Sequence, residues 1–140
     1  MKRAHYVVLV ALLTMLLAGC GSPPPIPEEA INGAYDVINQ YDGVRESLVD
    51  VQGRKIVLVL IVSPATSEQY AKQLGENFAR ALAAWASSHS EDFKGLPTKE
   101  YLGKLYELYD LDIRVAWNAD HVIAHGIKTR GKYNSIRWID

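Results

Sequence analysis

Two histidines four positions apart, His121 and His125, are the first side chains in this sequence that could do chemistry. On an α-helix, histidines at this spacing share a face and can bind one zinc ion. The intervening residues favour a β-strand, in which four residues span about 13 Å, whereas a zinc–nitrogen bond is about 2.1 Å long. We therefore expect no shared metal ion, although Asp112 or Asp120 could orient one of the histidines.

Paired carboxylates could act as a general acid and base, and they occur at Glu28-Glu29 and Glu91-Asp92. Both pairs fall at predicted helix starts or in polar loops, where acidic residues are common and where no apolar surroundings would raise a pKa. The serines lack a GxSxG elbow, and no glycine-rich phosphate loop is present. The sequence therefore predicts no catalytic site and no cofactor.

A cluster of basic residues near the end of the sequence is interleaved with aromatic ones. Its members are Lys128, Arg130, Lys132 and Arg137. Residues 28–50 are, by contrast, strongly acidic. Two interpretations stay open: the cluster contacts lipid phosphates or an acidic partner, or it is a solvated hairpin that pairs with the acidic segment.

The only cysteine, Cys20, closes an apolar run that begins after Lys2 and Arg3. A charged start, an apolar stretch and small residues at its end have the layout of a secretory signal peptide. The run is shorter than the roughly 20 residues that a membrane span needs. The ending Leu17-Ala18-Gly19-Cys20 resembles the lipobox of bacterial lipoproteins.

This resemblance implies that the chain is cut before Cys20 and that fatty acids, such as palmitate, are attached to the cysteine. Residues 1–19 are then the signal peptide, residues 20–27 the lipidated cysteine with its spacer, and residues 28–140 one domain. Gly21 would direct the protein to the outer membrane, facing the periplasm, in a Gram-negative source, and otherwise the anchor lies in the cell membrane. An intact membrane anchor and ordinary secretion are the alternatives.

The elements that must position these residues belong to a small acidic domain. Cleavage leaves 121 residues with thirteen basic and sixteen acidic side chains, a formal charge of −3. This charge argues against nucleic-acid binding, and this length supports a single core. Residues 21–27 carry four prolines and predict a stiff polyproline spacer of about 22 Å.

Periodicity and turn residues then predict the elements of the domain. We expect helices over residues 28–41, 66–88 and 97–109, and strands over 44–51, 55–62, 111–117 and 121–128, with a possible last strand at 136–139. Because residues 55–62 are apolar on both faces, we expect that strand to be buried on both sides. The order α-β-β-α-α-β-β indicates an α+β fold, a small antiparallel sheet of four or five strands with two to three helices packed on one face.

Together these features predict a membrane-anchored, non-enzymatic interaction or structural module of the bacterial envelope, with an envelope protein as its partner. The alternative is a small-molecule or lipid-binding protein, or a small hydrolase, with a pocket between the helices and the sheet. Such a pocket would be lined by Tyr70, Trp85, Tyr101 or Trp117. A tyrosine stripe of Tyr101, Tyr106 and Tyr109 is expected to be core packing rather than a ligand surface.

Overall fold

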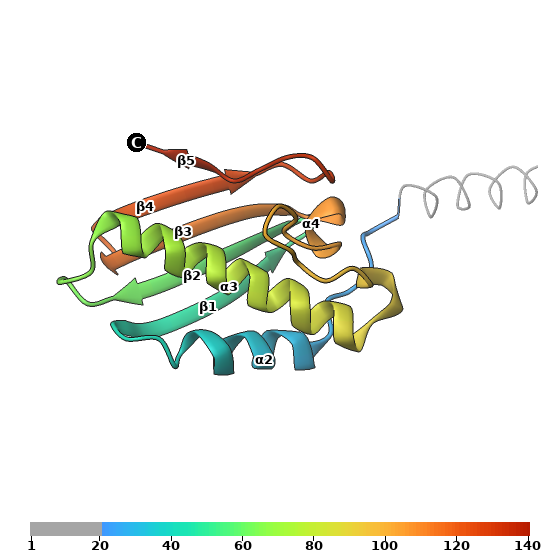
Figure 1. Cartoon of the computed structure of the whole chain (residues 1–140), viewed down its shortest axis with the longest axis horizontal. Helices are drawn as coiled ribbons and strands as arrows, with labels where there is room; N and C mark the ends of the chain where they lie inside the picture. Colours follow the sequence, from blue (N-terminus) through green and yellow to red (C-terminus); the bar gives the residue numbers. More distant parts are fainter. Residues whose placement is uncertain (1–20) are drawn as a thin grey trace, which may run out of the picture.

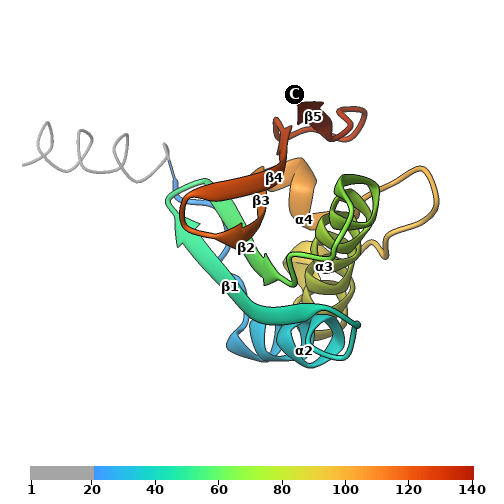
Figure 2. The same cartoon turned by 90° about the vertical axis from the view of Figure 1, so that its left-hand side faces the viewer.

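The computed structural model describes residues 21–140 and confirms the predicted α+β class (Figure 1). Five strands form one sheet in the order β1-β2-β3-β4-β5, and the helices lie on one face of it (Figure 2). The elements are α2 (Glu28–Ile38), β1 (Val44–Gln52), β2 (Lys55–Val62), α3 (Glu68–His89), the 3₁₀ helix η1 (Glu91–Phe93), α4 (Leu105–Leu108), β3 (Asp110–Asn118), β4 (His121–Lys128) and β5 (Arg137–Ile139). None of these helices is long and apolar enough to cross a membrane.

One pair of strands departs from the antiparallel arrangement that the sequence predicted. The β1·β2, β3·β4 and β4·β5 pairs are antiparallel, but β2 and β3 run parallel, with Leu58 opposite Ile113. Parallel neighbours need a long crossover connection, and here the chain between them contains α3, η1 and α4. The crossover places α3 across the sheet. The β1–β2 hairpin and the β3–β4 hairpin therefore pair with each other through β2 and β3.

The turn between β1 and β2 follows the sequence signal closely. Gln52 pairs with Lys55, which leaves Gly53 and Arg54 as a two-residue loop. Gly53 has a φ of 60°, a conformation that glycine adopts without a steric cost. The turn therefore fixes the register of the hairpin and brings Arg54 to the tip.

The core lies between the helices and the sheet. Alternate residues of β2 point into it, and Ile56, Leu58 and Leu60 have no exposed surface. The long helix α3 begins two residues after its predicted start, because Ser67 is its cap: the Ser67 hydroxyl accepts a hydrogen bond from the Tyr70 amide. Its buried side packs on α2 and the sheet and fills this interior.

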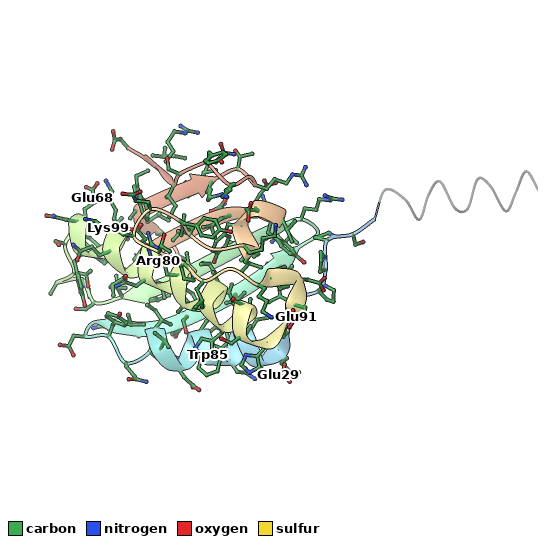
Figure 3. The ribbon with its side chains drawn as sticks, turned by 45° about the vertical axis from the view of Figure 1, so that its right-hand side comes forward. Glu29, Glu68, Arg80, Trp85, Glu91 and Lys99 are labelled. Carbon is green, nitrogen blue, oxygen red and sulfur yellow. The ribbon has the colours of Figure 1, made fainter. Side chains whose placement is uncertain are left out.

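The predicted helix over residues 97–109 is wrong for most of its length. Only α4 is helical, and residues 95–104 form a loop that crosses α3. Gly95 has a φ of 152° and Gly103 one of 116°, which are not helical angles. The Arg80 side chain donates hydrogen bonds to backbone carbonyls of this loop, including that of Lys99, beside which it lies in Figure 3. Tertiary contacts, rather than helical periodicity, thus determine the path of this segment.

Candidate functional site

Cys20 and the rest of the lipobox lie outside the described residues, but the structure describes the spacer that follows them from Gly21 onward. The Tyr109 hydroxyl donates a hydrogen bond of 2.7 Å to the Pro24 carbonyl, and the side chain of Ile26 packs against the core. The Arg54 guanidinium donates a hydrogen bond to the carbonyl of Gly21. The spacer therefore lies against the domain over much of its length and is not a free rod of about 22 Å.

Lys128 is not available to an external anion, although the sequence placed it in the basic cluster. Its side chain is 3% exposed. The ammonium group donates hydrogen bonds to the carbonyls of Tyr106 at 2.9 Å, Thr129 at 3.2 Å and Gly131 at 2.8 Å. Burial lowers the pKa of Lys128 from its ordinary value, against the attraction of nearby carboxylates. Its role is to hold the loop after β4 against α4.

The other three members of the basic cluster are exposed, and each has its own surroundings. Arg137 is in β5 opposite Ile127. The Lys132 ammonium lies 5.7 Å from the centre of the Tyr133 ring, and the Arg130 amide donates to the Asp110 carboxylate. Among the described residues no ion pair joins them to residues 28–50, which lie towards the opposite edge of the sheet (Figure 1). The internal pairing with the acidic segment is therefore not formed.

The two histidines engage different partners. His121 stacks on Trp117 and hydrogen bonds to the Asn118 side chain. His125 hydrogen bonds to Asp112 at 3.0 Å, so Asp112 is the carboxylate that orients a histidine. Within residues 21–140 no group of three or more potential ligands is placed to hold a metal ion.

The aromatic side chains that could have lined a pocket are used in packing. Tyr106 is fully buried and its hydroxyl donates to the Ala79 carbonyl, and Tyr109 is almost as deeply buried. Burial raises the pKa of Tyr106 and of Tyr109 above the ordinary value. Tyr106 and Tyr109 are therefore core, as predicted, whereas Tyr101 of the same stripe is half-buried in the loop before α4.

The four residues proposed to line a pocket between helices and sheet do not converge on one. The Tyr70 hydroxyl donates to the Asp42 carbonyl. The Trp85 ring lies against Gly33 of α2. Figure 3 shows Trp85 next to this helix. Tyr101 donates a hydrogen bond of 2.5 Å to Glu107. Burial and this hydrogen bond raise the pKa of Tyr101, and the same hydrogen bond lowers the pKa of Glu107 against the effect of burial.

Several hollows mark the surface of the described residues, and two of them border the spacer or the loop near Lys99. One, of about 460 Å³, lies between the spacer and the β1–β2 turn and is mostly apolar. The other, of about 450 Å³, lies between α3, the loop near Lys99 and the loop near Lys132. The second hollow has carboxylates and cations mixed along its wall, among them Glu76 and Arg80, which already pair with each other. It therefore offers no single charge to a ligand.

The face of the sheet that the helices leave bare is the largest feature that sequence reasoning missed. Two rows of side chains, one residue from each strand, cross it. We call them the uncovered face. The first row is Leu48, Val59, Arg114, His125 and Ile139, and the second is Asp50, Val57, Asp112, Ile127 and Arg137.

The prediction that β2 is buried on both sides is therefore wrong. Residues Val57, Val59 and Ile61 alternate with the core positions and are only partly covered. Figure 2 shows that α2 and α3 lie on the other side of the sheet. The apolar run of β2 was the available signal: two apolar faces imply two covers, and the described residues supply only one of them.

Polar side chains occupy the centre of the uncovered face and bind one another. Asp112 is 7% exposed and accepts hydrogen bonds from Arg114 at 3.2 Å as well as bonding to His125. Around this cluster Leu48 is 51% exposed, and Ile139 is also exposed. The face thus combines a satisfied polar centre with apolar side chains that water contacts.

Comparison with known proteins finds no relative with which the features described above could be compared. No protein-family model matches the chain, and neither a curated protein nor a solved structure shows significant similarity to it.

Proposed function

We propose that this chain is a lipoprotein of the bacterial cell envelope that acts as a non-enzymatic interaction module. Acylated Cys20 anchors it, to the outer membrane facing the periplasm in a Gram-negative source. The uncovered face of the sheet binds a partner protein. The single observation that carries the binding role is that the domain's own helices leave this face uncovered, with exposed apolar side chains beside its polar centre.

The anchor is supported by the lipobox-like sequence and tested by its chemistry. Mass spectrometry of the N-terminal peptide, from protein made in a bacterium, should find Cys20 at the N-terminus with fatty acids on it. A Cys20→Ala variant should keep residues 1–19. Finding a free amine and a free thiol on Cys20 would contradict the anchor.

Two observations support a non-enzymatic role: the interior is filled, and the paired carboxylates are exposed. The interior between helices and sheet is filled by side chains with no exposed surface. Glu28 and Glu29 begin α2, and Glu91 and Asp92 begin η1. All four side chains face solvent, and their negative charge is favourable at the start of a helix. A catalytic acid would need burial to raise its pKa.

The partner's chemistry follows from the charges that border the uncovered face. Its β1 side carries Glu46 and Asp50, and its β5 side carries Arg137. A complementary protein surface is therefore basic opposite β1 and acidic opposite β5, with an apolar part where β1 and β2 lie side by side. Leu48 and Val59 are neighbours across β1 and β2 and would form the apolar contact.

A photo-crosslinking amino acid at Leu48 should trap a specific protein in cells, and the same group at Gln73, exposed on α3, should not. The trapped protein, once purified, should bind the domain directly. Leu48→Arg should weaken that binding at least tenfold, while Gln73→Arg leaves it unchanged. Equal effects of the two substitutions would show that the uncovered face is not the binding surface.

A further inference from the structure

The point at which the chain leaves the domain is fixed by contacts. Gly21 is the first described residue, and its carbonyl accepts a hydrogen bond from the Arg54 side chain at the tip of the β1–β2 turn. Three residues further on, the Pro24 carbonyl accepts from Tyr109. The exit therefore lies at the end of the sheet where β1 ends and β2 begins (Figure 1).

Basic residues from two distant parts of the sequence lie at this end. The Asp110 amide donates to the Arg54 carbonyl at 2.8 Å, and the Asp110 carboxylate accepts from the Arg130 amide at 2.8 Å. Lys55 is the β2 neighbour of Asp110. Arg54, Lys55 and Arg130 are all exposed. Three exposed basic residues thus have their backbones next to Asp110, beside the exit of the chain.

Apolar surface lies next to these cations. The hollow of about 460 Å³ is bounded by the spacer, the β1–β2 turn and the start of α2, and it includes Ile26, Ile31 and Val51. Val51 is 39% exposed. Exposed apolar side chains flanked by Lys and Arg are typical of surfaces that lie in the headgroup region of a bilayer.

Acidic side chains also occur at this end. Asp50 and Asp110 lie on the strands, where three basic residues outnumber them, and other acidic residues lie on the helix side. Figure 3 shows Glu29 of α2 and Glu91 of η1 there. An anionic membrane would attract the sheet side of this end and repel the helix side. The charge distribution therefore favours one tilt of the domain.

We propose that the end formed by the β1–β2 turn and the loop after β4 rests on the anionic headgroups of the membrane that holds the anchor. This inference depends on the acylation of Cys20 proposed above. In this orientation the strands lead away from the bilayer, and the uncovered face is turned sideways, where a partner beside the protein can reach it. The contacts of Arg54 and Tyr109 with the spacer keep the domain from rotating freely about its tether.

A binding experiment tests the contact apart from the anchor. Residues 20–140 with Cys20→Ser contain the whole described domain and no lipid. At low salt this protein should sediment with phosphatidylglycerol vesicles and not with phosphatidylcholine vesicles. A basic residue near an anionic surface contributes about fivefold to binding, so Lys55→Gln with Arg130→Gln should weaken sedimentation about 25-fold.

The matched control removes two exposed cations elsewhere, with Arg45→Gln and Lys99→Gln, and should leave vesicle binding within about twofold. Arg54 is not substituted because it also holds Gly21. Failure of the parent protein to bind phosphatidylglycerol vesicles, or equal losses in the two double variants, would overturn the proposed contact.

The orientation is tested with the lipidated protein in the same vesicles. A fluorophore on a new cysteine at Gln52, in the β1–β2 turn, should be quenched by headgroup-labelled lipid. A fluorophore on a new cysteine at Ala119, about 26 Å away along the strands, should not. Equal quenching at both sites overturns the orientation while the anchor stands, whereas mass spectrometry without acyl chains on Cys20 would refute the anchor itself.

Discussion

Replacing Lys128 by methionine should destabilise the domain by about 2 kcal/mol, although the substitution removes a buried charge. The ammonium group donates to three carbonyls, and two of these keep another donor in the variant. The Tyr106 carbonyl also accepts from the Gly131 amide at 3.2 Å, and the Thr129 carbonyl accepts from the Asn134 side chain at 3.2 Å. The Gly131 carbonyl loses the hydrogen bond of 2.8 Å that Lys128 supplies.

A buried polar group that loses its partner costs about 1–3 kcal/mol. Relief of the buried charge offsets part of the three lost bonds, which gives the net estimate of about 2 kcal/mol. Urea unfolding followed by far-UV circular dichroism measures this difference. Lys132→Met, at an exposed lysine of the same loop, is the control and should change the free energy of unfolding by less than about 0.5 kcal/mol. A Lys128→Met protein as stable as this control would refute the structural role of the ammonium group.

The pH dependence supplies a second test of the same group. Burial lowers the pKa of Lys128 below its ordinary value of 10.5. Between the lowered pKa and 10.5 the unfolded chain binds more protons than the folded one, so this group's contribution to stability rises with pH. The difference in unfolding free energy between the parent and Lys128→Met should therefore grow as pH increases through that window. A difference independent of pH would contradict the lowered pKa.

Three further substitutions test the packing. Gly33→Ala should cost about 1–3 kcal/mol despite the better helix propensity of alanine, because the new Cβ would lie 2.2 Å from Trp85 Cδ2; thermal unfolding measures this, and a second substitution, Trp85→Leu, should recover part of the loss. Tyr106→Phe should make stability less steeply dependent on pH above 10: the raised pKa of Tyr106 means that the unfolded chain loses this proton first, so the parent loses stability as pH rises past 10. Ser67→Ala should cost about 1 kcal/mol by removing the cap of α3, whereas Ser88→Ala near the end of the same helix should cost little, and equal losses in urea unfolding would count against the cap.

Local chemistry let the sequence predict most of the secondary structure. The β1–β2 hairpin, the long helix α3 and the strands β3 and β4 lie within a few residues of their predicted positions, because apolar periodicity and turn glycines act over short stretches of chain. The lipobox-like segment is likewise a linear pattern, and the structure's described residues do not extend to it. The core role of Tyr106 was predicted correctly, although the helix expected to carry it together with Tyr101 and Tyr109 is limited to α4.

Only the tertiary structure decided which strands are neighbours and what covers them. The parallel pairing of β2 with β3 depends on how α3 crosses the sheet, which no local pattern specifies. Periodicity shows that both faces of β2 are apolar, but it cannot show that Val57 and Val59 remain without a helix over them. In the same way, charge counting grouped Lys128 with Arg130, whereas the fold buries the first and joins the second to Asp110, which also bonds to Arg54. Residues far apart in sequence become neighbours only when the sheet forms.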